Sequence, residues 1–434
     1  MYVLMISPGY PQEIPYFTRA LKWAGAHVLG VSDQPEGALP VEARQNLAGY
    51  LQVPSLQDED AVVEAVKHWT APVHVDKVEC LWEPGMLLAA RIRETLGAQG
   101  MTVEETLPFR DKDRMKQVLS AAGVRTPRHA RATSAEECRD AAHSIGFPLI
   151  LKPIAGAGSA DTYRVDDAAQ LEETLPRLAH LPEVNVEEFI EGDEFTFDTV
   201  CVGGEVAYYS ITKYRPHPLI ARTVEWVSPQ IVMLRDVDAE EYAAGCEMGR
   251  AVLRALNFDT GFTHMEWFRK PSGEVVFGEI ACRPPGARSV DVMNYASDTD
   301  LFAGWADAVV HGQFTQKVER RYNAVIIYKR AQGQGRVYRM EGLEHLLNKY
   351  GEHIVLIDLL PLGSQRRNWK QTLLSDGYLI IRHPDYARAL EIADYVYVMR
   401  TGTVLSEGSR EEFGGDTEAL VARWLYASGN AQQG

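Results

Sequence analysis

The sequence lacks the long apolar runs and the paired cysteines that mark two large classes of protein. A membrane-spanning helix needs roughly 18 consecutive apolar residues, and we find no such run, so we expect no membrane segment. The five cysteines are odd in number, and no two stand close together in the chain. They are Cys80, Cys138, Cys201, Cys246 and Cys282. This pattern argues against a disulfide framework or a zinc knuckle and predicts a protein of the reducing cytoplasm.

An excess of positive charge is also missing. The chain has 44 Lys and Arg residues against 60 Asp and Glu residues, which gives a net charge of −16. A nucleic-acid binder normally carries a basic face, so we expect no nucleic-acid partner. The N-terminal residues MYVLMISPGY lack the basic region and the cleavage site of a signal peptide, and we expect them to form a first core strand.

Two glycine motifs that bind phosphates are absent as well. The Walker A pattern G-x-x-x-x-G-K-[ST] does not occur, and the loop SPGYPQE after the first predicted strand holds one glycine instead of G-x-G-x-x-G. A P-loop NTPase and a dinucleotide fingerprint are therefore not supported. A few local lysines could still hold phosphates inside an acidic protein.

The composition that remains is that of a globular protein, with 46% hydrophobic and 24% charged residues. The length predicts about three domains, at roughly 150 residues each. In residues 1–100, strand and helix signals alternate, which predicts an α/β fold with a parallel, doubly wound sheet. We expect strands at 3–6, 27–32 and 78–83, and helices at 12–24, 59–69 and 85–97.

From residue 111 the predicted elements change. We expect a helix that Asp111 or Asp113 caps, then a helix at 134–145, a strand at 147–153, a glycine-rich loop at 155–162 and a helix at 167–179. A later helix at 238–256 has Asp238 as its predicted N-cap. Towards the C-terminus we expect a strand at 377–384 and helices around 385–394 and 409–426.

Two glutamates on a predicted hairpin are the first candidates for chemistry. If residue 270 faces 275 across the turn PSG, then Glu266 faces Glu279, and two like charges side by side need a cation. Mg²⁺ suits carboxylate oxygens and commonly also binds substrate phosphates. An exposed hairpin with two solvated glutamates is the alternative. The period of two predicts further residues on the same face: His264, Phe268, Phe277, Ala281 and Arg283.

Two lysines and an extended segment are the next candidates. Lys152 ends the apolar run PLIL, just before the glycine-rich loop, and could form a phosphate cradle with it, although an exposed lysine before an ordinary turn is the alternative. Lys116 lies on the capped helix, where a solvated lysine is common. The segment VEEFIEGDE could offer backbone groups of residues 188 and 190 to an adenine edge, and Glu194 could accept from ribose hydroxyls.

The order of these pieces resembles the ATP-grasp superfamily. The runs are DKDRMKQVLSAAGVRTP, PLILKP with its glycine loop, VEEFIEGDE, HMEWF and GEIACRPPG, and they span about 111–288. The resemblance implies a Rossmann-like domain at 1–110, a small lobe at 111–195, a central lobe with a metal site at 196–315 and a C-terminal lobe and tail at 316–434.

The resemblance also implies roles for individual residues. Phosphate contacts are implied for Lys116, Lys152, Gly156, Gly158 and Ser159, the adenine hinge for Glu187, Glu188, Phe189 and Ile190, and the ribose contact for Glu194. Glu266 and Glu279 resemble the ligands of Mg²⁺, with Mn²⁺ as the alternative ion, and Arg283 resembles the arginine that stabilises an acyl phosphate. Lys152 is implied in catalysis with Arg283.

One position departs from the family pattern, since Ala281 stands where many members have asparagine. The form EIACRPPGAR looks more like the amino-acid ligase branch. The resemblance therefore implies an ADP-forming, ATP- and Mg²⁺-dependent ligase that joins a carboxylate to an amine through an acyl phosphate. It implies small-molecule substrates, no membrane, a cytoplasmic location and a homodimer, as in many related enzymes.

Three alternatives stay open at this point. A carboxylase of the biotin-carboxylase type would activate bicarbonate on the same scaffold. A non-catalytic ATP-binding protein would agree with Ala281. The tail ALEIADYVYVMRTGTVLSEG resembles the end of an ABC transporter ATPase, but the chain lacks Walker A, Walker B and LSGGQ motifs.

Four further residues are candidates for substrate contacts. Glu83 follows a strand of the predicted parallel sheet, where ligands often bind, although a surface glutamate is the alternative. His264 shares the face of the two glutamates. Arg288 follows the PPG turn, and Arg215 lies in a segment at 213–223 that could be a substrate lid or a solvated loop.

Overall fold

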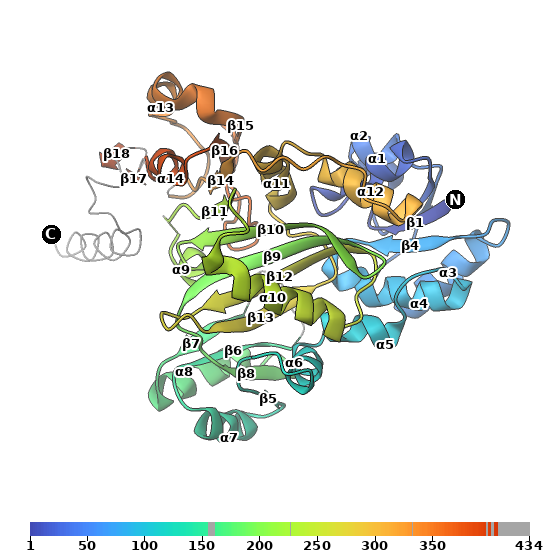
Figure 1. Cartoon of the computed structure of the whole chain (residues 1–434), viewed down its shortest axis with the longest axis horizontal. Coiled ribbons are helices and arrows are strands. Elements are labelled where there is room, and N and C mark those ends of the chain that lie inside the picture. Colours follow the sequence, from blue (N-terminus) through green and yellow to red (C-terminus); the bar gives the residue numbers. More distant parts are fainter. Residues whose placement is uncertain (155–160, 226, 332, 396–397, 401–402, 407–434) are drawn as a thin grey trace. The chain divides into compact units, whose positions relative to one another are not determined.

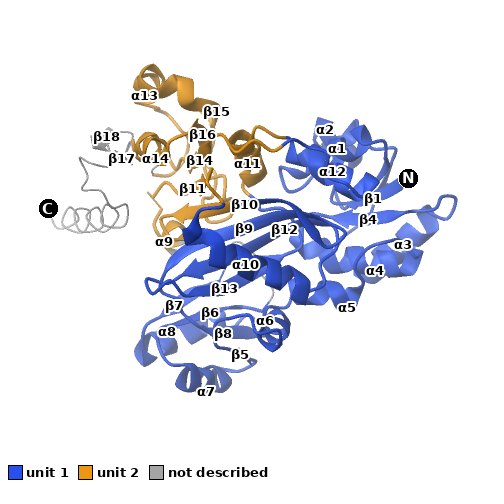
Figure 2. Cartoon of the chain, viewed as in Figure 1, with its two compact units in different colours: residues 1–210, 238–286, 300–317 blue, residues 211–237, 287–299, 318–434 orange. Residues whose placement is uncertain are grey.

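The structure is a computed structural model, and it describes the chain except for residues 155–160, 226, 332, 396–397, 401–402 and 407–434 (Figure 1). The predicted helix at 409–426 and most of the predicted glycine-rich loop lie outside the described residues. The chain forms two compact units (Figure 2). Unit 1 comprises 1–210, 238–286 and 300–317, and unit 2 comprises 211–237, 287–299 and 318–434. The predicted division into four parts stays a prediction.

Unit 1 begins with the predicted parallel sheet, whose strand order is β3-β2-β1-β4. The strands are β1 Tyr2–Ile6, β2 His27–Ser32, β3 Gly49–Gln52 and β4 Lys77–Cys80, with helices α1 Ile14–Trp23, α2 Val41–Arg44, α3 Glu59–Trp69, α4 Met86–Leu96 and α5 Val103–Thr106. The strand β3 was not predicted. The run VLMI is fully buried because a parallel sheet covered by helices hides both faces of its strands.

A second sheet of unit 1 has the order β5-β8-β6-β7 and is antiparallel. Its strands are β5 His129–Ala132, β6 Leu149–Pro153, β7 Tyr163–Val165 and β8 Val184–Glu188, and its helices are α6 Lys112–Ala121, α7 Ala135–Ile145 and α8 Ala168–Leu178. Each helix has a side-chain N-cap, from Asp111, Ser134 and Asp167 respectively. These caps satisfy N–H groups that a helix start leaves without partners.

The third part of unit 1 contains the predicted hairpin. Its strands run in the order β13-β12-β9, followed by the first residues of β10. The elements are β9 Asp193–Val202, β10 Glu205–Arg215, β12 Gly261–Arg269, β13 Val275–Ala281, α10 Glu240–Ala255 and α12 Leu301–His311. Asp238 was wrongly predicted as the N-cap of α10. Ala239 holds that position without a side-chain bond, and Asp238 accepts a hydrogen bond from the Tyr209 hydroxyl.

The hairpin contains a β-bulge that the sequence did not reveal. Glu266 pairs with Glu279 as predicted, but Trp267 pairs with Phe277, so Gly278 is an extra residue. A side chain at Gly278 would lie 2.8 Å from the carbonyl oxygen of Glu266, and only glycine permits this close approach. The prediction that Phe277 shares the glutamates' face is therefore wrong. The predicted facing of residues 270 and 275 is shifted by one residue for the same reason.

Unit 2 begins with the last residues of β10, and its strands then run in the order β11-β14-β16-β15. Its elements are α9 Pro218–Thr223, β11 Gln230–Met233, α11 Ser289–Ser297, β14 Asn323–Tyr328, α13 Leu343–Tyr350, β15 Ile354–Leu359, β16 Gly377–His383, α14 Tyr386–Asp394, β17 Val398–Arg400 and β18 Thr403–Ser406. The strand predicted at 377–384 is confirmed as β16, which pairs with strands on both sides.

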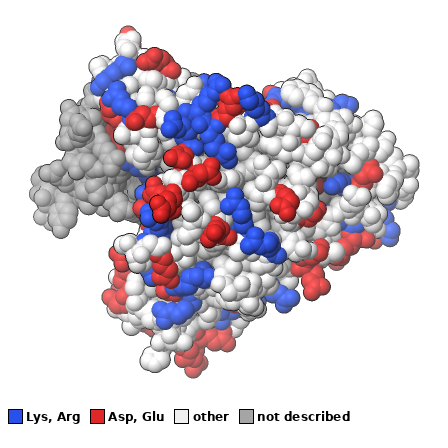
Figure 3. Space-filling view, in the orientation of Figure 1, with Lys and Arg blue, Asp and Glu red and all other residues white. Residues whose placement is uncertain are grey.

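Three expectations from the composition can be compared with the structure. No helix in the described part of the chain has the length and apolar character needed to cross a bilayer. On the face that Figure 3 draws, basic and acidic side chains lie intermixed, without a broad field of either sign. The five cysteines are all free, which agrees with the absence of a disulfide framework.

Candidate functional site

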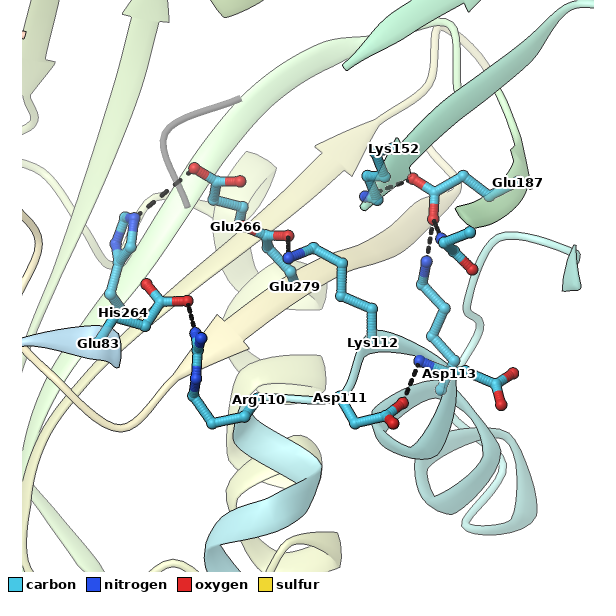
Figure 4. A network of polar contacts seen from close by, with 12 residues as sticks. Glu83, Arg110, Asp111, Lys112, Asp113, Lys152, Glu187, His264, Glu266 and Glu279 are labelled. Atoms are coloured by element: carbon cyan, nitrogen blue, oxygen red, sulfur yellow. Dashed lines mark hydrogen bonds and ion pairs between the residues drawn. The ribbon is translucent and has the colours of Figure 1, made fainter. Parts of the chain in front are cut away.

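The two glutamates of the hairpin lie side by side on one face of unit 1. Glu266 on β12 is directly opposite Glu279 on β13, so the predicted register is confirmed at this pair (Figure 4). On the other side of β12, Phe268 faces Glu194 and His264 faces Asp198. Directly opposed residues share a face, so four carboxylates gather there. Burial first, and then the negative charges of Glu266 and Glu279, raise the pKa of Glu194 well above its usual value.

Lys112 is the nearest cation to this pair, and the sequence analysis missed it. Its Nζ lies 3.2 Å from Oε2 of Glu279, and its side chain is 9% exposed. Lys112 is the first residue of helix α6, directly after the N-cap Asp111. Burial would raise the pKa of Glu279, but Lys112 and Lys152 outweigh it and hold that pKa at about 2. The pair Asp-Lys at the helix start was the signal that could have revealed this residue.

His264 provides a second positive charge beside the glutamates. Its Nδ1 lies 2.5 Å from Oδ1 of Asp198, and its Nε2 lies 3.6 Å from Oε1 of Glu266. Burial would lower the pKa of His264, but Asp198 and Glu266 raise it to about 10. The imidazole is therefore a cation at neutral pH. Asp198, which orients it, was not predicted from the sequence.

Lys116 and Lys152 meet at one buried carboxylate, that of Glu187. Lys152 Nζ lies 2.6 Å from Oε1 of Glu187, Lys116 pairs with Oε2, and the Asn185 amide donates to Oε2 at 2.7 Å (Figure 4). Burial lowers the pKa of Lys116 to about 8. Burial would raise the pKa of Glu187, but the two lysines hold it at about 2. Both lysines are thus brought to one place, as their predicted common role requires.

The predicted adenine hinge begins inside a strand and continues past the end of that strand. Glu187 lies within the central strand β8, its backbone paired with both neighbouring strands, and its side chain points to the lysines. Its carboxylate balances the charge of the two lysines, and its predicted hinge role stays a prediction. Glu188 ends the strand and pairs with Arg125 at 3.1 Å, the Phe189 N–H donates to the Pro148 carbonyl at 3.1 Å, and Ile190 is buried. A hinge role for these three residues stays a prediction.

Arg283 is held by a glutamate from the N-terminal sheet. Its Nε and Nη2 lie 2.8 and 2.5 Å from Oε2 of Glu83, and Arg110 binds the other carboxylate oxygen. Burial would lower the pKa of Arg283, but Glu83 outweighs it and the pKa is raised. Glu83 follows the carboxyl end of β4 and is only 8% exposed, so the alternative of a surface glutamate is wrong. Arg110 was missed by the sequence analysis.

The remaining candidates are three residues outside the described part of the chain and two arginines of unit 2. Gly156, Gly158 and Ser159 lie outside the described residues. Arg215 belongs to unit 2, ends strand β10 and binds Asp394 with both Nη atoms at 3.1 and 3.0 Å, so it is not part of a lid loop. Arg288, also in unit 2, is 8% exposed and binds Asp291 at 2.9 Å. Substrate roles for both arginines stay predictions.

The facing carboxylates suit a divalent metal ion whose remaining ligands are water and phosphate oxygens. Within the described ranges, no three His, Cys, Asp or Glu residues form a complete metal cage. Mg²⁺ in phosphate-transferring sites typically takes one or two carboxylates and completes its shell with water and phosphate oxygens. Glu266 and Glu279, which face each other across the hairpin, fit that requirement.

The arrangement defines a class of protein. Three lysines and a protonated histidine face a group of carboxylates, as a site for a metal-bound polyphosphate requires. Comparison with known proteins gives the class its name. Residues 117–290 match the sequence model of the ATP-grasp domain, and the chain thus contains an ATP-grasp domain.

Relatives of the chain include ligases. It is 29% identical over 218 residues to an L-arginine-specific L-amino acid ligase of Bacillus subtilis, a match covering 49% of this chain and 52% of the ligase. The chain thus matches about half of that relative's length. The structure resembles an L-amino acid ligase from Bacillus licheniformis, with TM-score 0.72, 19% identity and coverage of 91% of this chain and 97% of the other.

The structure also resembles that of a ribonucleotide synthetase. N5-carboxyaminoimidazole ribonucleotide synthetase from Thermotoga maritima matches with TM-score 0.66 and 20% identity, over 90% of this chain and 96% of the other. At such low identity the two structural likenesses establish the fold, which is the α/β fold with additional lobes that the sequence predicted.

Proposed function

We propose that this protein is an ATP-dependent carboxylate–amine ligase that forms an amide or peptide bond, with amino acids as its substrates. The observation that carries the proposal is the single face on which Glu266 and Glu279 lie side by side, with Lys112 and Lys152 as the cations that lower the pKa of Glu279. A nucleotide carries the matching charges, because its phosphates suit the lysines and its metal ion suits the glutamates.

The lysines provide the phosphate contacts in this proposal. Lys116, Lys152 and Lys112 each pair with a glutamate, and an arriving polyphosphate would compete for the same ammonium groups. Mg²⁺, when bound between Glu266 and Glu279, would neutralise charge that develops on the transferred phosphoryl group. Because the lysines are already ordered by Glu187 and Glu279, little side-chain reorganisation is needed when the nucleotide binds.

Arg283 serves the second half of the reaction. A substrate carboxylate oxygen attacks the γ-phosphorus of ATP, ADP leaves, and the amine nitrogen then attacks the acyl carbon and releases phosphate. The oxygen on that carbon becomes negative as the amine adds. Arg283 can donate to it, and Glu83 fixes the guanidinium so that its direction is set before the substrate arrives.

The test is phosphate release measured across pairs of amino acids, with mass spectrometry of the products. We expect release that requires both a carboxylate and an amine, together with a dehydrated condensation product. The variant Arg283→Ala should keep nucleotide affinity within about threefold while amide formation falls by about 100-fold or more. Equal loss of nucleotide binding and product would mean that Arg283 supports the fold and not the reaction.

A non-catalytic ATP-binding protein is the second candidate, because Ala281 has no side-chain oxygen to offer a metal and is buried. Tight ATP binding without phosphate release on a broad amino-acid panel would favour it. Bicarbonate-dependent turnover without a response to amines would instead favour a carboxylase. We also propose a cytoplasmic location, which the free cysteines support.

A further inference from the structure

A cavity within unit 2 is separate in its residues from the site described above. It has an empty volume of about 1240 Å³, open mouth included. Its walls come from β14, β15, β16, α13 and α14, and many of them are apolar: Ile327, Leu343, Leu346, Leu359, Leu379 and Ile392. Small-molecule sites commonly have mostly apolar walls and a few placed polar groups. The shape and the lining therefore suit a ligand with a hydrocarbon body.

One cation in this cavity stands apart from the others. The Lys329 N–H donates to the Gly377 carbonyl at 2.8 Å and the Lys329 carbonyl accepts from Asp376 at 2.9 Å, so its main chain is fixed in place. Its side chain lines the cavity. Among the described residues, neither an ion pair nor a hydrogen bond involves its ammonium group. Burial alone lowers the pKa of Lys329, to about 8.

The other charged side chains of the cavity wall have partners. Arg339 pairs with Glu341, and Arg336 donates to the Gly363 carbonyl at 2.6 Å. Arg366 binds Asp376 at 3.1 Å and Glu225 at 2.7 Å. Arg330 donates to the Ala221 carbonyl at 2.7 Å, and its guanidinium lies over the Trp369 ring. An ammonium group in apolar surroundings without an anion is unfavourable, and an anion that enters the cavity would remove that penalty. Within the described part of the chain, the buried Nη2 of Arg366 also has no hydrogen-bond partner, so the unmet electrostatic requirement at the cavity is for negative charge.

From these contacts we infer that the cavity binds an apolar monocarboxylate, whose carboxylate meets Lys329 and whose hydrocarbon part lies against the leucine and isoleucine walls. A free α-amino acid suits the site less well, because its ammonium group would approach Lys329 and Arg330. The two carboxylates of the cavity wall, Glu341 and Asp376, are already paired with arginines. The ligand class is therefore a carboxylic acid without a nearby amine. This inference does not depend on the proposed ligase activity.

The test uses isothermal titration calorimetry on the full chain without nucleotide. Octanoate is the probe, and octan-1-ol has the same hydrocarbon length without the charge. We expect octanoate to bind the wild type and Lys370→Met, an exposed control in the same unit, with equal affinity. Lys329→Met should weaken octanoate at least about tenfold and leave octan-1-ol unchanged, because the charge is removed and the volume is kept.

A second variant keeps the test valid if Lys329→Met fails to fold. Leu346→Asp places a negative charge in the half-buried wall on α13, and it should weaken octanoate more than octan-1-ol. Absence of octanoate binding to the wild type, or equal octanoate affinity in the wild type and in the folded variants, would overturn the inference. This binding test does not involve ATP, whereas the ligase proposal is tested by phosphate release. Failure of one proposal can therefore be distinguished from failure of the other.

Discussion

Lys116 is buried and Lys329 is half-buried, burial lowers the pKa of both to about 8, and the two residues differ in what surrounds the ammonium group. Lys116 in unit 1 is paired with Glu187, which it shares with Lys152. Lys329 in unit 2 has no such partner among the described residues and faces a largely apolar cavity. The comparison teaches that a similar lowering of a lysine pKa can occur with or without a paired carboxylate. One lysine has its counter-charge built into the protein, and the other requires it from outside.

The largest expected effect is on the paired side of this comparison. Lys152→Ala should abolish ATP turnover, because it removes one of the lysines that we propose to hold the ATP phosphates. We expect the variant protein to stay folded. Phosphate release and circular dichroism would measure the two properties. Turnover like that of the wild type would show that the paired lysines balance charge and do not hold phosphates.

The metal pair gives the next effect. Glu279→Gln should lower Mg²⁺-dependent activity by about 100-fold or more, because one of two facing carboxylates loses its charge. A Mg²⁺ titration of phosphate release would measure it. Glu274→Gln, at the exposed end of the same hairpin, is the matched control and should titrate like the wild type. An unchanged titration for Glu279→Gln would mean that the metal binds elsewhere.

The comparison of the two lysines also predicts opposite changes in stability. Lys116→Met should lower the free energy of unfolding by about 3 kcal/mol, because it removes one partner of a buried ion pair. Lys329→Met should raise it by about 1 kcal/mol, because an unpaired, half-buried charge is replaced by an apolar side chain of similar length. Urea unfolding at pH 7 would measure both. A change of the same sign in the free energy of unfolding of both variants would contradict the proposed difference between the two lysines.

The smallest effect is a pH dependence. The pKa of Glu187 is about 2 in the folded protein and near 4.5 when unfolded, so its stabilising contribution is complete above pH 4.5 and disappears as the pH falls through about 2. Glu187→Gln should therefore flatten the loss of stability in that window, measured by unfolding at pH 4.5, 3.5 and 2.5. The exposed control Glu344→Gln should leave the slope unchanged.

Much of the fold could be predicted because its signals are local. The buried strands at VLMI and HVLGVS and the helix that Asp111 caps follow from apolar patterns and a cap. The facing of Glu266 and Glu279 was predicted correctly, but from a turn register that is one residue off, and the bulge at Gly278 restores the pairing. The bulge at Gly278 could not be predicted, since it depends on a close approach to the Glu266 carbonyl. The N-cap of α10 failed because the Asp238 carboxylate is bound by the Tyr209 hydroxyl.

The sequence by itself determined which residue types were available and which stretch carries the ATP-grasp pattern, because periodicity, caps and motif order are properties of neighbouring residues. Tertiary structure alone decided which charges meet. Arg110 and Arg283 are brought to Glu83, Lys112 to Glu279 and Asp198 to His264 by elements far apart in the chain. Lys329 is an ordinary lysine in the sequence, and only the packing of unit 2 removes water from it without supplying an anion.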